Sequence, residues 1–186
     1  NKKDVIERLI NDITTLDLQL ENSLWLSQFD NYKFQAEAFF ISKSIESLKM
    51  LFPEIQIELQ KEAEVFTDRR ALELVLKNLF HNSILHGKAQ KIKIDVVTHK
   101  NSLLQISIVD DGQGFQGVAA SLGKEILKSQ HSKGNGIGLY LCKQLIKRLK
   151  GQIILNATAD DGERRTSPQT TEKGFAVLLI LPGGQR

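Results

Sequence analysis

Three glycines on alternate positions, Gly134, Gly136 and Gly138, stand directly before a segment with helical periodicity. In that segment, residues 139–149, apolar side chains recur every three or four positions and basic side chains occupy the other face. Glycine is a poor residue for starting a helix, because ordering it costs the most backbone entropy. Two interpretations are open: the glycines form a tight turn, or their bare N–H groups at a helix N-terminus form a cradle for phosphate.

The bulk properties narrow the class of protein. The chain has 186 residues, 41% of them hydrophobic, which suits one full domain and a short additional segment. The net charge of +3 is small and the basic residues are scattered, so we expect no nucleic-acid partner. No apolar run approaches the roughly 18 residues of a membrane span, and the first residues do not resemble a signal peptide.

The chemistry-bearing residues exclude two classes of enzyme. The lone cysteine, Cys142, fits a reducing cytoplasm, and its place on an apolar helix face indicates a packed thiol. The four histidines show no metal-ligand spacing, and no G-x-S-x-G motif is present. Metal-hydrolase and serine-hydrolase functions are therefore not expected.

The periodicity predicts an α+β domain preceded by a long helix. Residues 4–29 carry apolar side chains at three-to-four spacing without glycine or proline, which predicts an amphipathic helix that needs a partner.

A linker at 28–35 precedes the domain, which we start near residue 34. Further helices are expected over 41–52 and, capped by Thr67 or Asp68, up to His86. Strands are expected at 54–60, 91–97, 102–110, 152–158 and 175–182. The second and third of these form a hairpin, and residues 159–173 form a mobile excursion. This order predicts a mixed, mostly antiparallel sheet with helices on one face.

A second glycine cluster follows the strand that ends at Asp110. Its G-x-G-x-x-G spacing matches a dinucleotide-binding fingerprint, but that fingerprint opens a helix in a βαβ unit, whereas this strand belongs to a hairpin. Asp110 and Asp111 would also repel a pyrophosphate. A carboxylate at a strand end suits a hydrogen bond from an exocyclic amine, and Gly112 and Gly114 would let a flat ring approach the backbone. The alternative is a solvated turn.

The third feature is a pair of asparagines, Asn78 and Asn82, inside the helix that ends at His86. Because they are four residues apart, they share one face of that helix. Asparagine is a poor helix former and usually occurs at caps. The two residues are either simple surface residues or point at a ligand, where an amide oxygen could bind a hard cation such as Mg²⁺.

In this order, Asn-x-x-x-Asn on a helix, Asp-x-Gly-x-Gly after a strand and Gly-x-Gly-x-Gly before a helix resemble the GHKL ATP-binding superfamily. Its members include sensor histidine kinases, DNA gyrase, MutL-type repair proteins and a heat-shock chaperone. The segments "LELVLKNLFHNS", "ISIVDDGQGF" and "GNGIGLYLCKQLIKRLKG" look most like the catalytic domain of a bacterial histidine kinase. The resemblance implies a two-layer α/β sandwich over residues 34–186. Residues 1–30 resemble the second helix of such a kinase's dimerisation domain, present here in part.

The resemblance implies a role for each matching residue. Asn82 would bind Mg²⁺ and, together with Asn78, would form the catalytic, phosphate end of the site. Asp110 would accept a hydrogen bond from the adenine amine, and Gly112 and Gly114 would form the adenine floor. The phosphates would be bound by Lys133, Gly134, Gly136, Gly138 and Leu139. Residues 115–133 would form a lid, in which Lys124, Lys128 or Lys133 reaches the γ-phosphate.

The chain departs from the family pattern at several positions. Leu85 stands where many members have a lysine, the phenylalanine lid motif is absent between Gly117 and Gly134, and Lys150-Gly151 replaces a pair of glycines. None of the four histidines precedes an acidic residue. A phosphoacceptor histidine is therefore expected on a dimerisation helix that is not in this chain.

The function implied by the resemblance is transfer of the γ-phosphoryl of ATP·Mg²⁺ to that histidine. The implied partners are the phosphoacceptor helix, a response-regulator receiver domain and, through the N-terminal helix, a second copy of the full-length protein. Gyrase-type hydrolysis is disfavoured, because those relatives have glutamate at the position of Asn78 and an amide is no general base. A GHKL serine kinase and a nucleotide-sensing module without transfer activity are the alternatives. Whether the parent protein is anchored in a membrane is left open.

Overall fold

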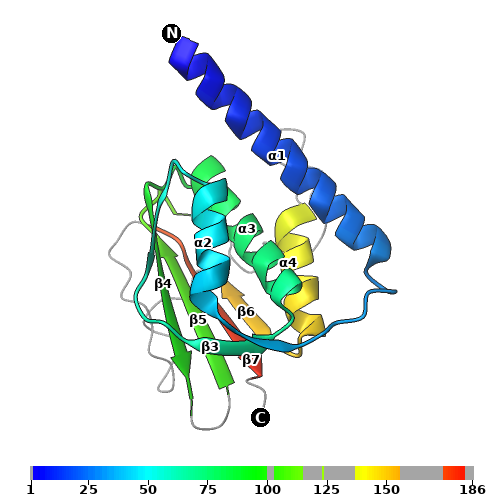
Figure 1. Ribbon diagram of the computed structural model, residues 1–186. Helices are drawn as coiled ribbons and strands as arrows, with labels where there is room; N and C mark the ends of the chain where they lie inside the picture. Colours follow the sequence, from blue (N-terminus) through cyan, green and yellow to red (C-terminus); the bar gives the residue numbers. More distant parts are fainter. Residues whose placement is uncertain (1, 100–102, 115–122, 124–136, 156–173, 183–186) are drawn as a thin grey trace.

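The computed structural model describes residues 2–99, 103–114, 123, 137–155 and 174–182 (Figure 1). The helices in these ranges are α1 (Lys2–Gln28), α2 (Ile41–Leu51), α3 (Arg69–Leu85) and α4 (Ile137–Arg148). The strands are β1 (Glu37–Phe40), β2 (Gln56–Leu59), β3 (Glu64–Thr67), β4 (Lys91–Thr98), β5 (Leu103–Asp110), β6 (Gln152–Leu155) and β7 (Ala176–Pro182). Every predicted helix and strand is present, and β1 and β3 are additional.

The main sheet has the strand order β2-β4-β5-β7-β6. β4 and β5 form the predicted hairpin, in which Ile94 faces Ile108, and β7 pairs antiparallel with both β5 and β6. β2 runs parallel to β4, because the connection between them passes through β3 and α3. The prediction of an α+β domain with a mixed, mostly antiparallel sheet is confirmed. β1 and β3 form a separate antiparallel pair.

The hydrophobic core lies between the main sheet and the layer formed by α2, α3 and α4 (Figure 1). Alternate residues of β4 and β5, such as Ile94 and Ile106, are fully buried against this layer. The rings of Phe52 and Phe80 meet edge to face, with their centroids 6.4 Å apart. Each such side chain stabilises the fold by about 1.5–3 kcal/mol through burial alone.

Asp68 caps α3 and holds the preceding linker in place. Its Oδ1 accepts a hydrogen bond from the Ala71 N–H at 2.9 Å, and its Oδ2 accepts from the Gln35 N–H at 2.8 Å and from the Tyr32 hydroxyl at 3.1 Å. Burial and the neighbouring Asp68 carboxylate raise the pKa of Tyr32. Tyr32 also packs against Trp25 and Phe34, with ring centroids 4.4 and 4.8 Å away. The predicted linker is therefore a packed segment.

The long helix α1 has two different faces. Leu18, Asn22 and Trp25 are buried, and α1 packs against α3 and α4. The predicted apolar stripe lies on the opposite side and is exposed, each side chain retaining between 49% and 64% of its accessible surface. Its members are Val5, Ile6, Leu9, Ile10, Ile13, Leu16, Leu20 and Leu24. The N-terminal part of α1 projects beyond the rest of the molecule (Figure 1).

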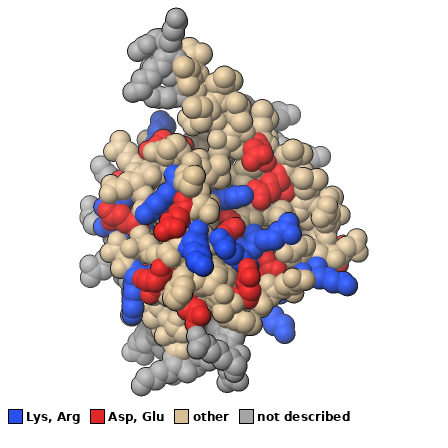
Figure 2. All heavy atoms as spheres, viewed as in Figure 1, with Lys and Arg blue, Asp and Glu red and all other residues tan. Residues whose placement is uncertain are grey.

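Three further features bear on the sequence predictions. Lys150, which the resemblance places at the position of a glycine, adopts a left-handed conformation with φ of 58° after α4. On the face shown in Figure 2, acidic and basic side chains are interspersed and no large area carries one sign of charge. In the part of the chain that the structure describes, no helix is long and apolar enough to span a membrane.

Candidate functional site

The three sequence motifs converge on α3. The end of β5 contacts α3 through a hydrogen bond of 2.7 Å from the Ser83 hydroxyl to Asp110. The start of α4 contacts α3 where Gly138 lies against Asn78. Lys133, Gly134, Gly136 and the predicted lid, apart from Gly123, lie outside the described residues. A backbone contact places Gly123 against α4 at Leu139.

Asp110 is a buried carboxylate at the end of β5, and it is held by three donors. Its Oδ1 accepts from the N–H groups of Gly112 and Phe175, at 2.9 and 3.1 Å, and its Oδ2 accepts from Ser83. Two carboxylate oxygens offer about four acceptor positions. The described residues therefore leave one position on Oδ2 for another donor, as the predicted contact with an exocyclic amine requires. The assignment of that amine to adenine stays a prediction.

Gly112 is needed for a close approach of two backbone segments. A Cβ at this position would lie 2.5 Å from the Gly87 carbonyl oxygen, just after α3. The next residue, Gln113, donates its N–H to the same oxygen at 2.7 Å. Gly114 has φ of 70° and lies against Gly174. Contacts within the chain itself therefore require glycine at both positions. The predicted role of the two glycines as an adenine floor would be a second reason for glycine there.

Asn82 is half-buried on α3. Its carbonyl accepts the N–H of His86 at 2.9 Å, which closes the last helical turn. Among the described residues its side-chain amide makes no hydrogen bond, so its oxygen is available to a ligand. No group of three His, Cys, Asp or Glu that could hold a metal occurs in the described residues. Mg²⁺ fits such a position, because it commonly takes only one or two ligands from a protein and the remainder from phosphates and water.

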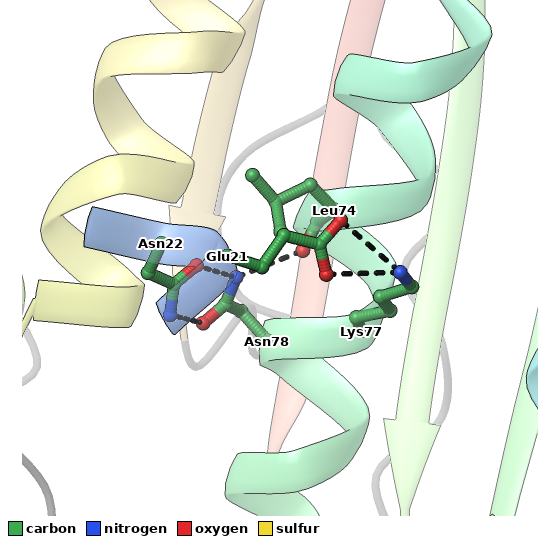
Figure 3. Close-up of polar contacts among 5 residues, drawn as sticks. All are labelled: Glu21, Asn22, Leu74, Lys77 and Asn78. Carbon is green, nitrogen blue, oxygen red and sulfur yellow. Dashed lines mark hydrogen bonds and ion pairs between the residues drawn. The ribbon is translucent and has the colours of Figure 1, made fainter. Parts of the chain in front are cut away.

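Asn78 differs from Asn82, because its side chain is buried and bonded within the protein (Figure 3). Its Nδ2 donates to Asn22 of α1 and to the carbonyl of Leu74, at 2.8 and 2.9 Å, while its Oδ1 accepts from Asn22 at 2.8 Å. The predicted role of Asn78 at the phosphates would require the pair with Asn22 to separate. Asn22 was not among the predicted site residues.

Two further contacts join α1 to α3 beside this pair. Lys77 forms an ion pair of 2.9 Å with Glu21 (Figure 3). The Nε2 of His81 lies 3.0 Å from the Thr15 hydroxyl. Burial, and secondarily the charge of His86, lower the pKa of His81. The N-terminal helix is therefore docked on the asparagine-bearing helix by polar as well as apolar contacts.

Cys142 of α4 is fully buried, and its thiol contacts the Val75 carbonyl at 3.7 Å. Burial raises the pKa of this thiol well above its usual range. A thiol that stays protonated is a poor nucleophile. The prediction of a packed cysteine without a catalytic role agrees with this environment.

Comparison with known families decides what kind of domain this is. The family model described as "Histidine kinase-, DNA gyrase B-, and HSP90-like ATPase" matches residues 67–184, more than half of the chain. The chain belongs to this ATPase family. The match begins at the cap of α3 and ends after β7, so it contains the part of this GHKL domain that carries Asn78, Asn82, Asp110 and Gly138.

Curated relatives of this GHKL domain are named as sensor proteins. The sensor protein LytS of Oceanobacillus iheyensis is 29% identical over 172 residues, which cover 84% of the chain and 28% of LytS. The adaptive-response sensory-kinase SasA of Prochlorococcus marinus is 25% identical over 178 residues, which cover 86% of the chain and 46% of SasA. The chain thus spans less than half the length of both relatives.

Solved structures share the fold of this GHKL domain. The Acinetobacter baumannii histidine kinase AdeS aligns with a TM-score of 0.69 at 22% identity, covering 97% of the chain and 84% of AdeS. Full-length ShkA in complex with AMPPNP aligns with a TM-score of 0.69 at 15% identity, covering 95% of the chain and 37% of ShkA. At these identities the likeness shows the fold, including the long helix ahead of the α+β domain.

Sequence reasoning missed three residues at the site. Ser83 and Phe175 contact Asp110 from 27 and 65 positions away, and Asn22 contacts Asn78 from 56 positions away. Of these three residues, only Asn22 has a sequence pattern that could have identified it. It stands between Leu18 and Trp25, four residues after one and three before the other, on a second and narrower apolar stripe of α1.

Proposed function

We propose that this chain is the ATP·Mg²⁺-binding catalytic domain of a sensor histidine kinase, preceded by the second helix of its dimerisation domain. The domain transfers the γ-phosphoryl group of ATP to a histidine on another helix of the same kinase, and a response-regulator receiver domain is the next partner. The observation that carries the proposal is the buried Asp110 carboxylate, held by three donors with one acceptor position left. The family match and the sensor-kinase relatives support it.

In this proposal, the residues of the chain bind and orient the nucleotide. Asp110 accepts the exocyclic amine of adenine on its free Oδ2 position, and the backbone at Gly112 and Gly114 lies under the ring. The amide oxygen of Asn82 is a ligand of Mg²⁺, which neutralises charge on the phosphates when it is bound. The backbone from Lys133 to Leu139, most of it outside the described residues, binds the phosphate groups. No residue of the chain forms a covalent intermediate, so positioning and charge account for the transfer.

Phosphotransfer to a separately supplied histidine domain tests this function. We expect the chain alone, incubated with γ-labelled ATP, to acquire no acid-labile label and to release little phosphate. Adding a helical-pair domain that carries a histidine followed by an acidic residue should give acid-labile label on that domain. Asp110→Asn run in parallel should reduce that label strongly. ATP binding without label on any supplied histidine domain would contradict the kinase assignment, and steady phosphate release would indicate hydrolysis.

Removing the Asn82 side chain should weaken the binding of ATP with Mg²⁺ more than the binding of ATP without metal. We expect Asn82→Ala to weaken ATP binding in the presence of Mg²⁺ by about 1–2 kcal/mol and to change binding in EDTA little, since the amide is a cation ligand. Titration calorimetry with and without Mg²⁺ measures both. Asn11→Ala, at an exposed asparagine of α1, is the matched control. Equal losses under the two conditions would assign Asn82 a purely structural role.

The exposed apolar stripe of α1 should mediate association. Eight large apolar side chains on one side of a helix make an unusual amount of exposed apolar surface for a monomer. We expect sedimentation to show a concentration-dependent dimer, which Leu9→Glu combined with Ile13→Glu abolishes. Arg8→Glu, on the same part of α1 but outside the stripe, should leave the dimer intact. A monomer at all concentrations would contradict association through this stripe.

A nucleotide-sensing module that does not transfer phosphate is the second candidate. The specific observation in its favour is the bonding of Asn78, whose two amide protons are both used within the protein. Leu85, in place of a lysine, also removes a cation from this part of α3. The label-transfer experiment separates the two functions, because a sensor binds ATP and labels nothing.

A further inference from the structure

Three helices meet at one buried polar joint formed by Asn22, Asn78 and Gly138. The two asparagines exchange a pair of hydrogen bonds, each 2.8 Å long, and both side chains are almost completely buried (Figure 3). A Cβ on Gly138 would collide with the Asn78 Oδ1, and it would lie 3.6 Å from the Asn22 Nδ2. Gly138 is the second residue of α4 and the last glycine of the Gly-x-Gly-x-Gly motif. The joint thus connects α1 to both the asparagine helix and the start of α4.

The hydrogen bonds of Asn78 are committed to the protein in this arrangement. An asparagine amide has two protons to donate, and here one is given to Asn22 and the other to the Leu74 carbonyl. Its oxygen accepts from Asn22 on one side and is covered by Gly138 on another. The side chain therefore cannot donate to a ligand phosphate while α1 stays docked. The two uses of this amide exclude each other.

Leu18 and Trp25 bury apolar surface where α1 docks, but the polar contacts beside them are of modest strength. Besides the asparagine pair, they include the Glu21–Lys77 ion pair, both of whose side chains remain about one-third exposed, and the Thr15–His81 contact. Ion pairs of this exposure contribute little, and neutral hydrogen bonds are replaced by water when they break. Ligand binding of ordinary strength can therefore break these polar contacts.

We propose that this joint is a latch that couples the docking of α1 to the occupancy of the nucleotide site. In the docked state Asn22 keeps the Asn78 amide out of the site, and in the released state Asn78 turns to the phosphates of ATP·Mg²⁺. ATP binding and release of α1 then favour each other by the same factor, as linkage requires. This inference rests on the proposed function, since it presumes that the site binds ATP·Mg²⁺.

Binding titrations on the whole chain test the latch. We expect Asn22→Ala to bind ATP·Mg²⁺ about fivefold or more tightly than the parent chain, because the competing docked state is weakened. Ser23→Ala, on the exposed side of the same turn, should match the parent. In an Asn78→Ala background the Asn22→Ala change should have no further effect, because the competing amide is gone. A parent and an Asn22→Ala variant of equal affinity would overturn the latch.

Exchanging the charges of the Glu21–Lys77 ion pair tests the latch in a second way and leaves the Asn22–Asn78 pair intact. Glu21→Lys should tighten ATP·Mg²⁺ binding by placing two lysines together, and adding Lys77→Glu should restore the parent affinity. Hydrogen exchange should show residues 15–27 exchanging faster once ATP·Mg²⁺ is added to the parent chain. Unchanged exchange in α1 at saturating ATP, or equal affinity in all variants, would overturn the latch while leaving the proposed function standing. Absence of ATP binding in every variant would overturn both.

Discussion

Asp110→Asn is expected to weaken ATP binding by about 1.5–3 kcal/mol, roughly ten- to a hundredfold, while the fold stays intact. The amide oxygen can take the place of Oδ1 and accept from Gly112 and Phe175 as before. The amide nitrogen then takes the place of Oδ2 and can donate to Ser83, whose own proton can be given to the Leu79 carbonyl. All internal bonds are kept, and only the acceptor offered to the adenine amine becomes a donor.

Asp111→Asn is the matched control for this substitution. Asp111 is the next residue, it is exposed, and its Oδ1 accepts from the N–H groups of Gln90 and Lys91, at 2.8 and 2.9 Å. Its replacement removes the same charge at almost the same place and should change the ATP affinity measured by calorimetry little. Unchanged affinity in Asp110→Asn, or an equal loss in both variants, would show that no specific acceptor bond to adenine exists.

Asp68→Ala is expected to lower the free energy of unfolding by about 2–4 kcal/mol. The substitution removes the cap of α3, which alone is worth roughly 0.5–2 kcal/mol, and it leaves the Gln35 N–H and the Tyr32 hydroxyl without their acceptor. Urea unfolding followed by circular dichroism measures the change. Because the linker is anchored at the same carboxylate, we also expect faster hydrogen exchange at residues 32–36.

Two variants show which part of that loss belongs to which bond. Tyr32→Phe removes only the hydroxyl bond, and it should cost about 1 kcal/mol while the ring contacts with Trp25 and Phe34 remain. Asp30→Ala, at an exposed position of the same linker, removes an equal charge and should change stability by less than about 0.5 kcal/mol. If Asp68→Ala were as mild as Asp30→Ala, the linker would not be fastened by this carboxylate.

The elements of the fold could be predicted where the signal is local. The period of α1 and the alternation of β4 and β5 are repeated over enough residues to define one structure. β1 and β3 have four residues each and bury only one and two side chains, respectively, so their pattern merges with the segments beside them. Their pairing is a tertiary contact, which a local pattern does not contain.

The same distinction applies to the site. Asp110 and its glycines are adjacent in sequence and could be predicted together, whereas the donors that orient Asp110 come from α3 and from the residue before β7. Asn78 was singled out, but its partner Asn22 was missed, because the narrow stripe that carries Asn22 is masked by the much wider apolar stripe of α1. The third glycine of the Gly-x-Gly-x-Gly motif illustrates a further limit. Gly138 fits the family motif, yet in this structure the Asn78 side chain is what leaves no room for a Cβ.

The projection of α1 beyond the domain turns the helix into a lever arm. From Asn22 to its first turn, α1 extends by about 30 Å, at 1.5 Å for each residue. A tilt of only about 10° at the asparagine joint would therefore move the far end sideways by about 5 Å. This is about half of the 8–10 Å that separates the axes of two packed helices, so a helix packed against the exposed stripe would have to shift with it. A small adjustment near Asn78 would thus become a displacement of several ångströms at the opposite end of α1.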